Sequence, residues 1–449
     1  MNFQVVVLWS DALLFVLIAA IVALALWARR EDALRAAWVR VLRDGAAMSA
    51  ATVLAAFVLI GVLDSLHYRA RLESPPEAPV RYAVEVSSVL DALLVDLRQK
   101  TEKTYSAPLA THLFAKETLA DGSQRDFPRL RHGGRHLGDD LAAQAGDIVQ
   151  RFALGAGGGL VLWLLLHTAL RRRQHAADGF AVRAVSITLL PLLMLTGIAA
   201  ALAGGYHVFG TDKVGQDVLY LSLKSVRTGL LIGTLTTLVM LPLAVLLGIL
   251  AGYVGGWVDD LIQYLYTTLS SIPGVLLIAA AVLMMQVVID THPQWFATSA
   301  ERADARLLAL CLILGMTSWT GVARLLRGET LKLRELEYVQ AAQAFGVGRL
   351  AIMGRHILPN LMHIVLIALV MDFSGLVLAE AVLSYVGVGV DPSTISFGTM
   401  INTARMELAR EPMVWWSLLA AFGFMFALVL AANLFADAVR DAFDPRVAK

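Results

Sequence analysis

About nine apolar runs, each roughly 20 residues long, restrict the fold of this sequence more than any other feature. A helix of about 20 apolar residues crosses a hydrocarbon core roughly 30 Å thick. With 58% hydrophobic residues, 16% charged residues and a mean hydropathy of +0.67, the chain is too apolar for a soluble globular protein. We therefore expect an all-α integral membrane protein with about nine transmembrane helices, at residues 5–27, 46–66, 154–170, 184–203, 230–251, 265–288, 307–325, 364–386 and 414–436.

Basic residues between the runs predict the orientation, because Lys and Arg in short loops stay on the cytoplasmic side. The first two runs are joined by a segment that holds Arg29, Arg30, Arg35, Arg40 and Arg43. Arg440, Arg446 and Lys449 follow the last run. We expect the N-terminus outside and the C-terminus inside the cell. Residues 1–11 carry no Lys or Arg, so we interpret the first run as a retained span rather than a cleaved signal peptide.

Residues 68–150 differ from the runs on either side because their charges are mixed and no long apolar run interrupts them. Six apolar residues among them repeat at helical spacing and predict an amphipathic helix: Val86, Val89, Leu90, Leu93, Leu94 and Leu97. We interpret 68–150 as a small extracytoplasmic domain, in which no residue pattern names an activity. His132 and His136 are four apart, but the glycines between them disfavour a stable helix, and we expect no metal site.

A polar stretch at residues 337–359, here called the elbow, interrupts the apolar runs near the C-terminal end. Ala341 and Ala342 favour a helix whose small side chains let a partner surface approach closely. Gly346 tolerates a positive φ and is expected to end that helix. A second short helix is expected to start at about Arg349 and to run until Pro359 restricts it. The pattern predicts a helix-turn-helix to which another molecule binds.

The elbow resembles the cytoplasmic coupling loop of the membrane subunits of ATP-binding-cassette importers. The matching residues are Gln340-Ala341-Ala342, then Gly346, then Ile357-Leu358-Pro359. The likeness continues through other short motifs, in order: Phe209-Gly210-Thr211-Asp212, Gly215-x-Asp217, Ala251-Gly252-Tyr253, Gly255-Gly256-Trp257-x-Asp259, Ala379-Glu380-Ala381, Leu383-Ser384 and Arg440-Asp441-Ala442-Phe443-Asp444-Pro445. Over residues 207–449 the chain is therefore similar to the C-type permease of the dipeptide and oligopeptide importers. One departure is Gln340, which replaces the acidic residue for which that loop is named.

The resemblance implies a non-catalytic permease subunit of a bacterial inner (plasma) membrane importer for peptides. Its partners would be a second, B-type permease, two ATPases, an extracytoplasmic binding protein and the lipid bilayer. ATP and Mg would be bound by the ATPases, since this chain contains no phosphate-binding G-x-x-x-x-G-K-[ST] loop and is expected to bind no cofactor itself. A formal net charge of +1 gives no reason to expect nucleic acid. The residues that the resemblance assigns to ATPase coupling are Glu337, Gln340, Ala341, Ala342, Gly346, Arg349 and Pro359.

These features divide the chain into four expected parts. They are two transmembrane helices at 1–67, the extracytoplasmic domain at 68–150, two further transmembrane helices at 151–206, and a permease core at 207–449 with its coupling loop at 326–359. The core would contain six helices, which leaves three extra N-terminal spans whose role the sequence does not assign.

Asp372 and Glu380 are eight residues apart on one apolar run, and an ionisable group inside a membrane usually faces protein or water. They either line a translocation path or form hydrogen bonds that fix helix packing, and the second interpretation is the plainer one. Two other functions stay open. An ion-driven secondary transporter would use these acids to carry protons, and a membrane-anchored sensor or scaffold would use the spans only as anchors.

Overall fold

The computed structural model describes residues 3–28, 32–72, 81–118, 125–138, 140–174, 181–296 and 298–443. Four of the basic residues used above to predict orientation, Arg29, Arg30, Arg446 and Lys449, lie outside these ranges. So do Asp444 and Pro445 of the last motif.

The expected all-α membrane fold is confirmed. Among the described residues, eight helices are long and apolar enough to cross a membrane. They are α3 (Gly45–Ser65), α6 (Gln144–Gln174), α7 (Val182–Ala203), α8 (Val218–Val254), α10 (Gly274–Thr291), α11 (Ser299–Arg334), α14 (Leu358–Val386) and α16 (Trp416–Phe443). The segment Trp9–Ala23 of α1 (Trp9–Ala28) is a shorter apolar helix, which brings the total to about the nine expected.

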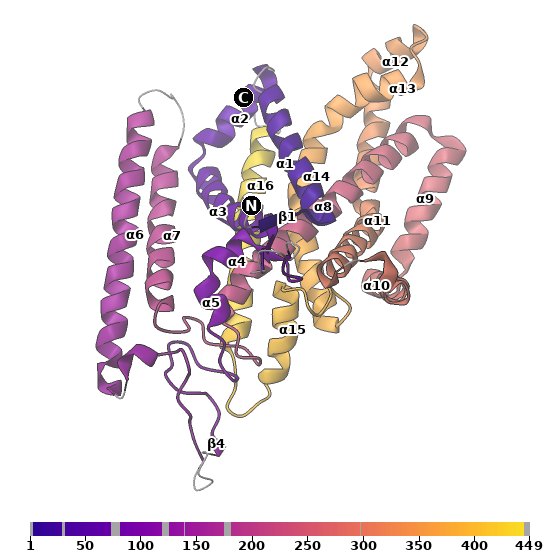
Figure 1. Ribbon diagram of the computed structural model, residues 1–449. Helices are drawn as coiled ribbons and strands as arrows, with labels where there is room; N and C mark the ends of the chain where they lie inside the picture. Colours follow the sequence, from indigo (N-terminus) through magenta and orange to yellow (C-terminus); the bar gives the residue numbers. More distant parts are fainter. Residues whose placement is uncertain are drawn as a thin grey trace. The chain divides into compact units, whose positions relative to one another are not determined.

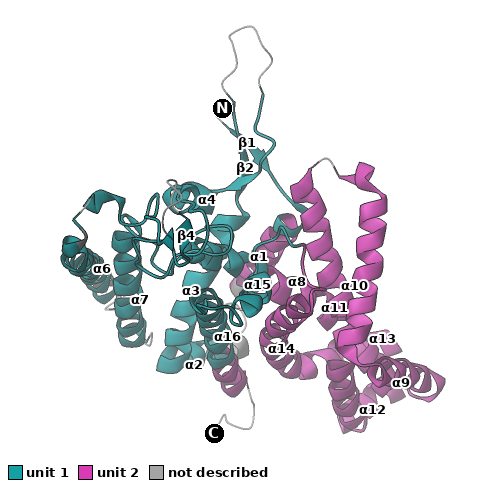
Figure 2. Ribbon diagram, turned by 90° about the horizontal axis from the view of Figure 1, so that it is seen from below, with its two compact units in different colours: residues 1–11, 27–230, 392–435 teal, residues 12–26, 231–391, 436–449 magenta. Residues whose placement is uncertain are grey.

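The chain forms two compact units that each draw on distant segments of the sequence (Figure 2). Unit 1 contains residues 1–11, 27–230 and 392–435, and unit 2 contains residues 12–26, 231–391 and 436–449. Three of the long helices, α1, α8 and α16, pass from one unit into the other. Each unit is described separately below.

In unit 1, α6 and α7 pack side by side as a hairpin (Figure 1). Small residues make the close approach possible: a Cβ on Gly155 or Gly159 would overlap the backbone of α7, and a Cβ on Gly197 would overlap the backbone of α6. This is the packing expected where helices associate in lipid without a hydrophobic driving force. An amphipathic helix, α2 (Asp32–Arg43), precedes α3, and Asp44 caps α3 by accepting a hydrogen bond from the Ala46 N–H at 2.7 Å.

The segment 68–150, called the polar domain from here on, has little regular structure. Strands β1 (Phe3–Val6), β2 (His67–Ala70) and β3 (Ser87–Ser88) form a small antiparallel sheet that the apolar runs did not predict. A second pair, β4 (Glu117–Thr118) and β5 (Arg125–Asp126), forms a hairpin. The single amphipathic helix expected over residues 86–97 is wrong, because the chain forms two short helices, α4 (Val89–Leu93) and α5 (Val95–Gln99), that meet at Leu94. The capping box of Ser88 and Asp91 starts α4 three residues later than Val86.

Unit 2 holds α9 (Gly256–Ser271), α10, α11, α14 and parts of α1, α8 and α16. The span expected over residues 265–288 is wrong in one respect: it is not a continuous helix. Ile272 takes an extended conformation before Pro273, as the residue before a proline prefers, and only α10 continues as an apolar helix. The helix α9 before this break is separate and amphipathic, and it follows α8 after a turn at Gly255, where φ is +67°. In unit 1, the short helix α15 (Phe397–Glu407) precedes α16.

Candidate functional site

The elbow folds as the helix-turn-helix that its sequence predicted. Helix α12 (Glu337–Ala344) ends in a turn in which the N–H groups of Phe345 and Val347 donate to the carbonyls of Ala341 and Ala342 at 2.9 and 3.1 Å. Gly346 lies in this turn with φ at +76°, a conformation that favours glycine. Helix α13 (Arg349–Ile352) starts at the expected residue. Figure 1 shows α12 and α13 together at one end of unit 2.

The expectation that Pro359 ends the second helix is wrong. The chain stays helical from α13 through a π-helical turn, η4 (Met353–Ile357), into α14, and Pro359 occupies the first turn of α14. A proline is tolerated in a first turn because its missing N–H has no partner to lose there. The elbow is thereby continuous with a transmembrane helix.

The inner side of the elbow is packed into the core of unit 2. Val339, Ile352 and Ile357 are each fully buried in one cluster with residues from the ends of α8 and α11. Ala342 packs against the same cluster, and its methyl group is small enough for α12 to lie close to it. A force on the elbow therefore acts on α8, α11 and α14 together.

The outer side of the elbow exposes apolar groups. Phe345 is 88% exposed and Leu350 80% exposed, while Tyr338 is 43% exposed. Of the residues predicted for coupling, one is half-buried, Ala342, and the others are exposed: Glu337, Gln340, Ala341, Gly346, Arg349 and Pro359. Gln340, at the position of the departure noted above, donates to the backbone carbonyl of Glu335 at 3.3 Å.

An ion pair next to the elbow joins α9 to α11. The Nε and Nη2 atoms of Arg327 donate to the two carboxylate oxygens of Asp259, both at 2.6 Å. This paired, bidentate geometry is the strongest form of an Arg–carboxylate contact. The hydrogen bonds and charge of Arg327 lower the pKa of Asp259 against the smaller opposing effect of burial. The amphipathic helix α9 is therefore fixed to the span that leads into the elbow.

Asp372 and Glu380 both lie on α14 but differ in their surroundings. Glu380 is buried, and the Ser384 hydroxyl donates to its Oε1 at 2.6 Å. Asp372 is half-buried, and its Oδ2 has no hydrogen-bond partner among the described residues. The bond between Glu380 and Ser384 joins two turns of the same helix, so both the packing interpretation and the translocation-path role of the two acids stay predictions.

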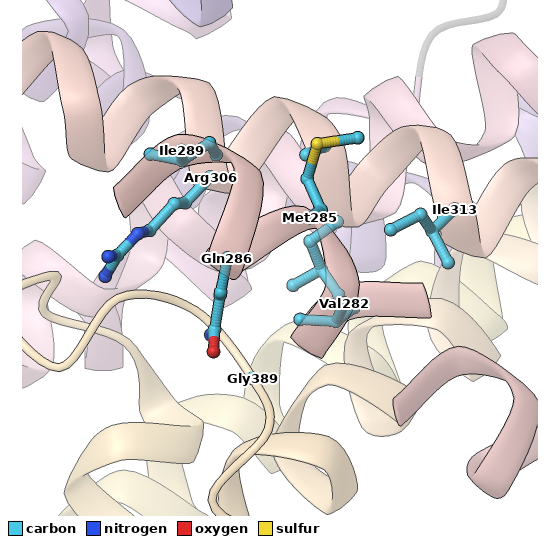
Figure 3. A pocket seen from close by; sticks show the side chains of 9 residues that line it. Val282, Met285, Gln286, Ile289, Arg306, Ile313 and Gly389 are labelled. Atoms are coloured by element: carbon cyan, nitrogen blue, oxygen red, sulfur yellow. The ribbon is translucent and has the colours of Figure 1, made fainter. Parts of the chain in front are cut away.

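A small cavity lies between α10, α11 and the loop after α14 (Figure 3). Its lining includes Val282, Gln286, Arg306 and Gly389. Its volume of about 10 Å³ is that of one water molecule, so it is no binding site for a peptide. Arg306 beside it pairs with Asp290 and Asp391 and so ties the ends of α10 and α11 to that loop.

Sequence reasoning missed a buried charge cluster in unit 1, the Glu102 cluster, formed by Glu102, His207 and Asp217. The Nδ1 of His207 lies 2.8 Å from Asp217 Oδ2, and its Nε2 lies 3.3 Å from Glu102 Oε1. The Glu102 carboxylate also accepts hydrogen bonds from the N–H groups of Arg131, His132 and Gly133. Asp217 also caps the start of α8, since its Oδ1 accepts from the Leu219 N–H at 2.9 Å.

The Glu102 cluster shifts the pKa values of its members. Burial alone would raise the pKa of Glu102, but the hydrogen bonds from His207 and from the backbone lower it to about 2. Burial alone would lower the pKa of His207, but its bonds to Asp217 and Glu102 raise it to about 9. His207 is therefore charged at neutral pH, and the cluster is a buried, fully paired triad.

Two further ion-pair groups join the N-terminal spans to α8 in unit 1. Arg227 donates to Asp11 at 2.6 Å, and Asp11 also lies 2.8 Å from His67. Lys224 donates to Asp64 at 2.7 Å and to Asp91 at 3.1 Å. The only sequence signal for these groups was a charged residue at the edge of an apolar run, and such a signal does not name its partner.

The elbow lies in the part of the chain that matches known proteins. The family model described as "Binding-protein-dependent transport system inner membrane component" matches residues 244–449. The chain is 30% identical over 242 residues to the oligopeptide transport system permease protein of Mycobacterium tuberculosis (strain ATCC 25618 / H37Rv), which covers 54% of this chain and 77% of the relative. The chain belongs to this family. It is a transport permease subunit of an ATP-binding-cassette importer and a multi-pass inner-membrane protein.

Other permeases of this family show the same extent of similarity. The oligopeptide transport system permease protein of Haemophilus influenzae is 30% identical over 248 residues, or 55% of this chain and 73% of the relative. The glutathione transport system permease protein of Pectobacterium atrosepticum is 31% identical over 243 residues, or 54% of this chain and 73% of the relative. The family model begins at residue 244, so it does not include the polar domain or the helices before α8 of this permease.

Proposed function

We propose that this permease forms the translocation path of a peptide importer together with a B-type permease, and that two ATPases drive it through the elbow at residues 337–359. An extracytoplasmic binding protein would deliver the cargo. ATP and Mg would be held by the ATPases, and this chain would have no catalytic site. The relatives named as oligopeptide permeases support peptides as the cargo class.

The observation that carries the proposal is the pair of exposed apolar side chains at the tip of the elbow. An exposed Phe345 and an exposed Leu350 on a segment too polar for lipid leave apolar surface in water, which is unfavourable unless a partner covers it. The opposite side of the same segment is buried in the helices that cross the membrane. The elbow therefore has one side for a partner and one side for the transmembrane helices.

The mechanism that follows is a rigid-body one. Closure of the ATPases around ATP would move the elbow, and its packing against α8, α11 and α14 would carry the displacement into the spans. Packed helices switch between discrete arrangements rather than deform continuously, so a small displacement at the elbow is amplified into alternating access. We also propose that the elbow lies in the cytoplasm, with the N-terminus outside and the C-terminus inside, since Arg324, Arg327, Lys332 and Arg334 precede it.

The test replaces the exposed apolar pair in the assembled transporter. Phe345→Ala and Leu350→Ala should each weaken ATPase binding by about 2 kcal/mol, or roughly thirtyfold, because they remove the anchors of the docking surface. Copurification of the ATPases and ATP-driven peptide uptake into vesicles would both be measured. Met406→Ala, at a 71% exposed position on α15, is the control. The proposal would be contradicted if a variant with both substitutions still bound the ATPases and took up peptide at the normal rate.

A further inference from the structure

A polar cavity of about 420 Å³ opens beside the elbow. Three separate segments of unit 2 line it: the end of α8, the last residue of α11 and the elbow itself. The lining residues are Tyr253, Val254, Arg334, Gln343, Val347 and Arg349. The predicted role of Arg349 in coupling thus acquires a specific place in the fold.

The charges of the lining side chains have one sign. Arg334 and Arg349 are both cationic, and no carboxylate lines the cavity. Arg334 forms an ion pair with Glu335, with 3.2 Å between its Nη2 and Glu335 Oε1. Within the described ranges no ion pair involves Arg349, which is exposed. The cavity therefore holds more positive charge than the chain itself neutralises.

The remaining polar groups also favour an acceptor. The Gln343 Nε2 donates to the Tyr253 hydroxyl at 3.2 Å, which leaves the Tyr253 proton available to donate in turn. Two guanidinium groups and a phenol hydroxyl are all donors, and planar guanidinium groups match a carboxylate in shape. A carboxylate is therefore the ligand chemistry that this cavity fits.

The position of the cavity favours a protein as the source of that carboxylate. Helix α11 has 36 residues, so at 1.5 Å per residue it is about 54 Å long against a hydrocarbon core of roughly 30 Å. Arg334 is its last residue, at the elbow end, and the excess length is enough to place it outside the hydrocarbon core. Val347 and Arg349 lie between Phe345 and Leu350 in the sequence, so a partner that covers the apolar pair also reaches the cavity.

We propose that this cavity receives an Asp or Glu side chain of the ATPase that binds the elbow. The inference rests on the proposed function, and it adds that this permease contributes the cations of the contact and the ATPase the anion. The apolar pair would supply most of the affinity, and the ion pair would set the orientation in which the ATPase pulls.

Charge reversal tests the inference separately from docking. Arg349→Glu and Arg334→Glu should each weaken ATPase copurification at least tenfold and should reduce its dependence on salt concentration. Lys332→Glu is the matched control, since it makes the same charge change on an exposed side chain of α11 that does not line the cavity. If Phe345→Ala releases the ATPase and Arg349→Glu does not, docking stands and this inference fails. If neither variant releases it, both fail.

A chemical readout identifies the partner group. In the assembled transporter carrying Arg349→Lys, a carbodiimide should join the introduced amine to a carboxylate within ion-pair distance. The expected product is a peptide of this permease linked to an Asp or Glu of the ATPase, identified by mass spectrometry and absent in the unsubstituted protein. A cross-link only to Glu335 of the same chain would overturn the inference.

Discussion

The Glu102 cluster and the elbow differ in how their side chains are paired. In the cluster, buried charged residues form ion pairs with one another, whereas the elbow exposes apolar side chains that no described part of the chain covers. The three charged residues of the cluster are buried and paired within unit 1. At the elbow of unit 2, Phe345 and Leu350 are exposed and Arg349 has no ion pair among the described residues. The comparison separates a region built for stability from one built for a partner, since buried polar groups must be paired and exposed apolar groups call for cover.

The largest expected effect comes from breaking the buried cluster. Glu102→Ala would leave the Nε2 of a charged His207 and three backbone N–H groups without their acceptor, which should lower the free energy of unfolding by about 3–5 kcal/mol. Thermal unfolding of the detergent-solubilised permease measures it. Glu117→Ala is the control, because the partly exposed Glu117–Lys103 pair should contribute less than about 1 kcal/mol. Equal losses in the two variants would contradict the assignment of the cluster as the stabilising region.

Two glycines with nearly the same φ, one beside the Glu102 cluster and one in the elbow, allow the two regions to be compared directly. Gly215 has φ at +78° and Gly346 at +76°. A Cβ on Gly215 would overlap the backbone carbonyl of Glu102, whereas a Cβ on Gly346 would meet open space. Gly346→Ala should therefore cost about 1–2 kcal/mol, the strain of the left-handed conformation alone. Gly215→Ala should cost clearly more, and thermal unfolding of both variants would show the difference. Similar losses would mean that the polar domain does not press on Gly215.

The last effect is a pH dependence of stability that comes from the cluster. The pKa of His207 is raised to about 9 from an ordinary 6.5, so its stabilisation is complete below pH 6.5 and is lost as the pH rises through 9. The free energy of unfolding should fall between these values by at most about 1.4 kcal/mol per pH unit. His207→Gln should remove this slope, measured by thermal unfolding from pH 6 to 10. A slope that persists in the variant would assign it to another group.

The apolar runs predicted the spans because each span is determined locally, by about 20 successive residues. The turn at Gly346 was predictable for the same reason, since a positive φ depends on one residue. The Glu102 cluster was not, because Glu102 and His207 are 105 positions apart and no local pattern links them. The break at Pro273 was missed although Ser270, Ser271 and Pro273-Gly274 mark it in the sequence, because the prediction rested on the length of the run as a whole.

The same contrast applies to the candidate site. The sequence predicted which residues the elbow would contain, and the structure assigns an inner side to Val339 and Ile357 and an outer side to Phe345 and Leu350. The cavity that Arg334 and Arg349 line could not be predicted, because it depends on how the ends of α8 and α11 pack against the elbow.

Cross-linking from the tip of the elbow tests the central claim most directly. The chain has one cysteine, Cys311, which is buried, so Phe345→Cys would carry a single exposed thiol. A thiol-reactive photo-cross-linker attached there in the assembled transporter should link the permease to an ATPase subunit, with a yield that changes when ATP is bound. Cross-links to lipid alone, or to no ATPase in an intact and active complex, would contradict the account.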